Sequence, residues 1–201
     1  MPGSELITLF GDDLAEIGSA RIGVRVVGGT KVGARELAQM LLAVGIADLL
    51  DRGVATLSER ESKNLFRSRR TLVVQSSEAS DGFTRALAKV AREPVQVDQL
   101  AAHLLGGRVA GPELALIGMA HGHLEDSGAV TRADGKAVRR VGTKLGLSPF
   151  DINDAGAEAL RPEWQQLRER WEAWKAANAE RADQLLEACK KSLGDAKQYD
   201  S

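Results

Sequence analysis

Residues 113–138, ELALIGMAHGHLEDSGAVTRADGKAV, contain the pattern that decides the fold. The first part has the length of a helix and ends at Gly128, a residue that commonly terminates helices. Two short β-prone runs follow, and the Asp134–Gly135 pair between them favours a two-residue hairpin turn. Residues 94–105 predict another short helix in front, with Asp98 placed to cap its start. Helix, helix and hairpin is the element order of a winged-helix unit.

Residues 33–51 predict a further helix, because small and aliphatic side chains recur there at helical spacing. Gly53 follows and supplies the left-handed turn that ends the helix. The runs 54–57 and 71–75 are β-prone and flank a charged stretch, so they predict an antiparallel hairpin with a long tip. A helix followed by a hairpin makes this segment a looser version of the winged-helix unit.

The C-terminal part predicts one long helix from residue 162 to 193. Four large apolar residues follow a 3-4-3 spacing, which is typical of a helix-packing seam: Trp164, Leu167, Trp171 and Trp174. The opposite face is balanced in charge, which favours packing over insertion of the tryptophans into a membrane surface. The seam has two possible partners, the body of the same chain or a second copy.

Together these patterns predict a mainly α fold, with winged-helix-like helix-plus-β-hairpin units and a long C-terminal helix. The expected organisation is a strand, helix and hairpin unit over residues 1–92 and a winged-helix-like unit over residues 93–150. Residues 151–201 form the long helix, which we expect to pack with residues 1–150 as one compact domain.

The charge balance, the cysteine count and the lengths of the apolar runs exclude several classes of function. The chain has 201 residues, with 27 Lys and Arg against 28 Asp and Glu, and this balance argues against an electrostatically driven nucleic-acid binder. The single cysteine, Cys189, excludes an intramolecular disulfide and a multi-thiolate zinc site. No run approaches the roughly 20 apolar residues that a bilayer span needs. We therefore expect a cytoplasmic protein whose membrane contact, if any, is peripheral.

Four segments carry a resemblance to a known family: LLDRGV at 49–54, DGFTRAL at 81–87, EPVQVDQL at 93–100 and LEDSGAV at 124–130. In order and spacing, residues 34–160 resemble the Golgi phosphoprotein 3-like family. The resemblance implies a cytosolic adaptor that binds phosphatidylinositol 4-phosphate or another anionic headgroup at a membrane surface. The family's arginine pair has no counterpart here, because residues 113–123 contain neither Arg nor Lys.

The predicted wing is rich in basic residues. The candidate anion-binding residues are Arg132, Lys136, Arg139 and Arg140, set around a turn with one carboxylate, Asp134. Arginine forks and lysine charges at this density suit phosphate or sulfate groups, and the alternative is a solvated hairpin face. Sequence-specific DNA binding is not expected, because the helix before the wing offers acidic residues and no Arg or Lys.

The tip of the first hairpin is the second candidate surface. It comprises an apolar pair followed by three arginines: Leu65, Phe66, Arg67, Arg69 and Arg70. Such a tip can place apolar side chains in a lipid interface while its cations hold anionic headgroups. The alternative is that the pair covers a neighbouring helix or a partner subunit.

Catalytic, metal and cofactor sites are not expected. The glycine-rich turn at 28–33 lacks the spacing of a phosphate-binding P-loop. His121 and His123 are two residues apart, so on a helix they point to different sides and do not grip one ion. No nucleophile, base and orienting residue stand at a defensible spacing. We therefore predict no enzyme activity, no metal and no cofactor.

The function predicted from the sequence is a non-enzymatic cytosolic adaptor. It would bind anionic phospholipid headgroups resembling phosphatidylinositol 4-phosphate, an acidic protein partner, or both, at a membrane surface. Two alternatives stay open. One is a winged-helix, nucleic-acid-associated protein, and the other is an assembly subunit that forms homo-oligomers through the C-terminal helix.

Overall fold

The computed structural model describes residues 3–18, 23–64, 67–77, 82–132 and 150–197. The longer helices are α2 (Ala34–Asp51), α3 (Gly82–Val90), α5 (Pro112–Leu124), α7 (Arg161–Ala177) and α8 (Ala179–Asp195). The shorter ones are α1 (Ile7–Phe10), α4 (Leu100–Leu104) and α6 (Asp154–Glu158), with 3-10 turns at Ser4–Leu6, Gly11–Asp13, Val27–Gly29, Val97–Gln99 and Glu125–Ser127. The fold class predicted from the sequence is confirmed: the protein is mainly helical, with small antiparallel sheets and a long helical C-terminal part, which is divided into α7 and α8.

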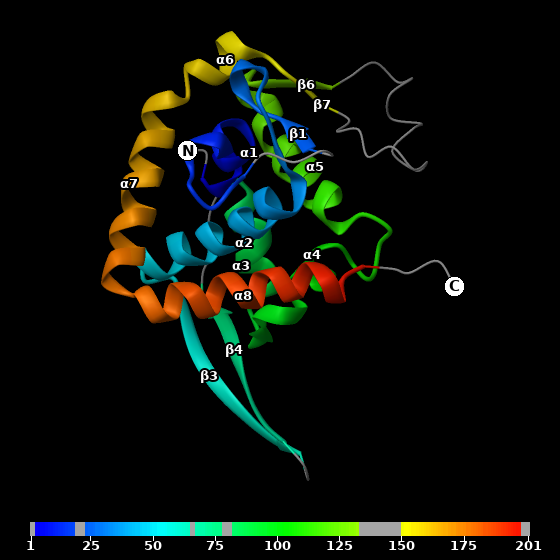
Figure 1. The fold of residues 1–201 in the computed structure, drawn as a ribbon, viewed down its shortest axis with the longest axis vertical. Coiled ribbons are helices and arrows are strands. Elements are labelled where there is room, and N and C mark those ends of the chain that lie inside the picture. Colours follow the sequence, from blue (N-terminus) through cyan, green and yellow to red (C-terminus); the bar gives the residue numbers. More distant parts are fainter. Residues whose placement is uncertain (1–2, 19–22, 65–66, 78–81, 133–149, 198–201) are drawn as a thin grey trace.

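Helix α2 lies at the centre of the molecule. It contacts α3, α5, α7 and α8, and its residues from Met40 to Leu49 are all buried (Figure 1). Gly45 permits α2 to lie close to α3, because a Cβ there would be 2.4 Å from Leu87 Cδ1. One hydrophobic cluster runs from Leu6 to Ala196 and draws on all three predicted segments.

The strands form three small antiparallel sheets. Strands β1 (Gly23–Arg25) and β2 (Lys31–Gly33) pair with each other, and β3 (Ala55–Asn64), β4 (Arg67–Ser76) and β5 (Val95–Gln96) make the second sheet. The register of the β3–β4 hairpin runs from Ala55↔Ser76 to Asn64↔Arg67. Its base is buried at Leu57 and Val74, and the rest projects away from the helices (Figure 1). The strands continue well into the charged stretch expected to be a tip, because a solvated ladder needs no apolar residues to keep its backbone paired.

The second hairpin differs from its prediction. Strand β6 (Val130–Arg132) pairs with β7 (Phe150–Ile152), in the register Val130↔Ile152 and Arg132↔Phe150. Phe150 packs edge-on against His121, with 5.9 Å between the ring centres, so β7 gains an apolar contact on α5. The predicted turn at Asp134–Gly135 lies outside the described residues.

The C-terminal helix is two helices, so the single helix expected over 162–193 is wrong. The helix ends at Asn178, where φ is -135° and ψ is 42°. The Asn178 side chain donates a hydrogen bond from Nδ2 to the Trp174 carbonyl oxygen at 2.9 Å. Asparagine side chains compete with the helical backbone in this way. Helix α7 crosses near the C-terminal end of α2, and α8 runs alongside α2 (Figure 1).

Asp98 does not cap α4 as predicted. The residue before that helix is Gln99, whose side chain makes no capping hydrogen bond; the Ala101 N–H in the first turn donates instead to Ser192 Oγ on α8 at 2.8 Å. Asp98 instead forms an ion pair with Lys191 on α8 and is 7% exposed. The pair ties the segment before α4 to the last turns of α8.

Candidate anionic-ligand site

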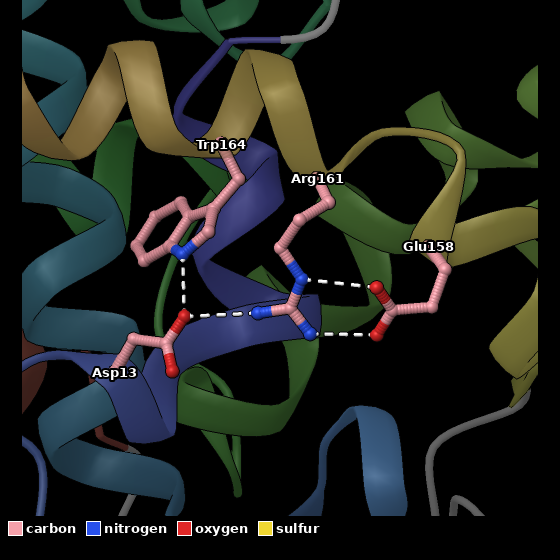
Figure 2. Close-up of polar contacts among 4 residues, drawn as sticks. All are labelled: Asp13, Glu158, Arg161 and Trp164. Atoms are coloured by element: carbon pink, nitrogen blue, oxygen red, sulfur yellow. Dashed lines mark hydrogen bonds and ion pairs between the residues drawn. The ribbon is translucent and has the colours of Figure 1, made fainter.

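The tryptophan seam of α7 lies inside the molecule. Trp164, Leu167 and Trp171 are at most 3% exposed, and the half-buried Trp174 stacks on Trp171 with 5.7 Å between ring centres. Trp164 stacks on Phe10 and donates from Nε1 to Asp13 Oδ2 at 2.8 Å (Figure 2). The seam therefore packs within the chain, on its N-terminal segment and on α2.

Arg161 fastens the start of α7 to the same segment. Its guanidinium donates to both oxygens of Glu158, at 2.6 and 3.0 Å, and to Asp13 Oδ2 at 3.1 Å (Figure 2). The group also lies over the Phe10 ring, 4.3 Å from its centre. The hydrogen bonds to Glu158 are the main reason that the pKa of Arg161 is raised. This guanidinium is saturated by protein groups and offers little to an external anion.

Two further cations of α7 are engaged in the same way. Arg170 contacts Asp48 Oδ1 at 3.1 Å, while Arg52 holds the other oxygen at 2.8 Å. Burial raises the pKa of Asp48 in spite of these two arginines. Lys175 pairs with Glu16. These cations of α7 are thus bound by Asp13 and Glu16 of the N-terminal segment and by Asp48 of α2.

The structure describes only part of the predicted wing site. Arg132 pairs with Glu125 at 3.3 Å, and its guanidinium lies 5.8 Å from the centre of the Phe150 ring. Lys136, Arg139 and Arg140 lie outside the described residues. The binding of anions by this wing stays a prediction.

The predicted hairpin site is also described only in part. Leu65 and Phe66 lie outside the described residues, and so do the side chains of Arg67 and Arg69. Arg70 is exposed on β4, opposite Glu61 in the hairpin register, and lines a pocket together with residues of α8.

A second basic surface was not expected from the sequence. It is a groove of about 490 Å³ at the C-terminal end of α8, here called the basic groove. The lining residues are Arg35, Arg108, Glu187, Lys190, Lys191, Gly194, Asp195 and Lys197. They come from the first turn of α2, from the loop between α4 and α5, and from the end of α8.

Local backbone geometry brings these segments together. Gly106 and Gly107 adopt positive φ values of 70° and 144°, which turn the chain sharply after α4. The Val109 N–H then donates to the Ala196 carbonyl at 2.9 Å, which places Arg108 beside the end of α8. Gln39 on α2 donates from Nε2 to the Leu186 carbonyl at 3.0 Å and holds the start of α2 against the same helix.

The groove is positive although the whole chain carries a net charge of -1. Five cationic side chains line it, against two carboxylates. Lys190 pairs with Glu187 at 3.1 Å, and Lys191 pairs with Asp98 and lies 3.7 Å from Asp195. Arg35 and Arg108 are exposed and form no ion pair with any residue that the structure describes. Two arginine forks thus face solvent in a groove that already holds three lysines, an arrangement suited to phosphate.

No family model, curated protein or solved structure matches this chain. The resemblance to the Golgi phosphoprotein 3-like family stays a prediction that rests on element order and spacing.

The described residues provide no membrane-spanning helix, no metal-binding cluster and no reactive cysteine. Among their helices, none has both the length and the hydropathy needed to cross a membrane. No cluster of three or more His, Cys, Asp or Glu residues in the described ranges has metal-binding geometry. Cys189 is buried, and burial raises the pKa of its thiol, so its thiolate is disfavoured.

Proposed function

We propose that this protein is a non-enzymatic cytosolic adaptor that binds anionic phospholipid headgroups, resembling phosphatidylinositol 4-phosphate, in the basic groove. The main support for the proposal is that Arg35, Arg108 and three lysines line one open groove, although they come from distant segments of the chain. The resemblance of residues 34–160 to a family of headgroup-binding adaptors supports the same reading.

The energetics suit a peripheral interaction. Each basic side chain close to an anionic membrane surface contributes about 1 kcal/mol of attraction. Arginine adds directional hydrogen bonds to phosphate oxygens, which a lysine charge does not match in geometry. Two arginines that form no ion pair with any described residue therefore favour a phosphorylated headgroup over a diffuse anionic surface.

The position of the hairpin is consistent with this function. Arg70 on strand β4 lines a pocket with Glu187 and Lys191, and these two α8 residues also line the basic groove. The hairpin and the groove thus adjoin the same helix, α8. A membrane or partner that engages the groove lies close to the hairpin base.

Vesicle co-sedimentation tests the proposal. Phosphatidylcholine vesicles with and without phosphatidylinositol 4-phosphate are incubated with the parent protein and with the R35E/R108E variant. We expect the parent to bind only the phosphoinositide vesicles. The variant should bind them at least about tenfold more weakly, because two attractive charges become repulsive.

The matched control is R92E/R181E, which makes the same change in net charge at two exposed arginines outside the groove. This control should bind like the parent. Equal losses in the two variants would show that net charge, and not the groove, governs binding. Absence of binding by the parent would remove the proposed function.

A further inference from the structure

A second pocket borders the basic groove. It has a volume of about 390 Å³, lies between α8 and the base of the β3–β4 hairpin, and is here called the hairpin-base pocket. Its lining residues are Glu59, Arg70, Thr71, Leu72, Asp98, Gln184, Glu187, Ala188 and Lys191. Glu187 and Lys191 line both cavities. Because Gln184, Glu187 and Lys191 share one face of α8, a ligand extending about 10 Å along the helix would reach both.

The lining of this pocket differs in chemistry from the basic groove. Two cationic side chains line it against three carboxylates, and Lys191 already forms an ion pair with Asp98. A second phosphate would meet carboxylates there, which disfavours it. Leu72 and Ala188 supply apolar wall, while Glu59 and Gln184 offer exposed acceptors. Arg70 and Thr71 offer donors.

This mixture fits a neutral group with several hydroxyls. A hydroxyl both donates and accepts hydrogen bonds, so a polyol ring can use carboxylate, amide, guanidinium and hydroxyl partners at once. We propose that the hairpin-base pocket binds the inositol or sugar ring of a phospholipid headgroup whose phosphate lies in the basic groove. This inference rests on the proposed function and assigns the ring of the headgroup to a second pocket beside the basic groove.

The test compares two lipids of equal charge. Vesicles contain the same mole fraction of either phosphatidylinositol or phosphatidylmethanol, both monoanionic phosphodiesters, of which only the first carries a polyol ring. Two hydrogen bonds of ordinary net strength predict that the parent binds the phosphatidylinositol vesicles about five- to tenfold more tightly. In the E59A/Q184A variant this ratio should fall to about one. The readout is the ratio of the two affinities. Loss of Glu59 changes the electrostatic potential for both lipids alike, so this effect cancels in the ratio.

The matched control is Q165A/E169A, which removes one amide and one carboxylate from exposed positions on α7. It should keep the parental ratio. A parental ratio of one, or a preference that survives in E59A/Q184A, overturns the inference and leaves the proposed function standing if binding still depends on Arg35 and Arg108. Absence of binding to either lipid and to phosphatidylinositol 4-phosphate overturns both.

Discussion

Acidification should destabilise the protein through His121. This residue lies on α5, is 1% exposed, and packs edge-on against Phe150. Burial lowers its pKa from 6.5 to about 4. The folded state therefore binds the proton more weakly than the unfolded state. The stability that this group contributes is fully present above pH 6.5 and is lost as the pH falls toward 4.

The size of the effect follows from the shift in pKa. Each unit corresponds to about 1.4 kcal/mol, so the free energy of unfolding should fall by about 3 kcal/mol between pH 7.5 and pH 4. Glu5 and Asp48 act in the opposite direction, because burial raises the pKa of each carboxyl and their protonation stabilises the fold as the pH falls. The His121 contribution is therefore read as the difference between the parent and the H121Q variant.

Urea unfolding followed by tryptophan fluorescence supplies the measurement. We expect H121Q to be less stable than the parent at pH 7.5, because the replacement packs less well in a buried site. This deficit should shrink by about 2–3 kcal/mol at pH 4.5, since the variant has no imidazole to protonate. A parent-minus-variant difference that does not change between pH 6.5 and 4.5 would refute the burial argument for His121.

Two further predictions concern the seam of α7. Trp171 is 2% exposed, so Trp171→Ala should cost about 3–5 kcal/mol of unfolding free energy in urea titrations, and a cost below about 1 kcal/mol would show that α7 is not docked as described. Because the seam packs within the chain, the midpoint of thermal unfolding should not depend on protein concentration, whereas a midpoint that rises with concentration would show that self-association stabilises the fold.

The sequence predicts those features that depend on a local pattern of residues. The hairpin after α2 follows from two β-prone runs, and the packed stripe of α7 follows from the spacing of Trp164, Leu167 and Trp171. The break at Asn178 was missed because apolar spacing continues across it. What ends the helix is a local bond from the Asn178 side chain to the backbone, which periodicity does not encode.

The basic groove had no local signal in the sequence. Arg35 is followed directly by Glu36 at the start of α2, and Arg108 follows two glycines in a loop. The two meet only because Val109 binds the backbone at Ala196 and because Gln39 binds α8. By contrast, Arg161 and Arg170, two cations of one helix, form ion pairs with Asp13 and Asp48, and Arg161 also pairs with Glu158. Charge density along a chain therefore does not identify which cations stay available to a ligand.

The location of the headgroup site can be measured directly by a heteronuclear NMR titration with inositol 1,4-bisphosphate, the soluble headgroup of phosphatidylinositol 4-phosphate. The proposed function predicts saturable shifts centred on the backbone amides of Arg35, Arg108 and the last turns of α8, and their loss in R35E/R108E. Shifts centred on the wing around Arg132, or no shifts at all, would contradict the assignment of headgroup binding to the basic groove.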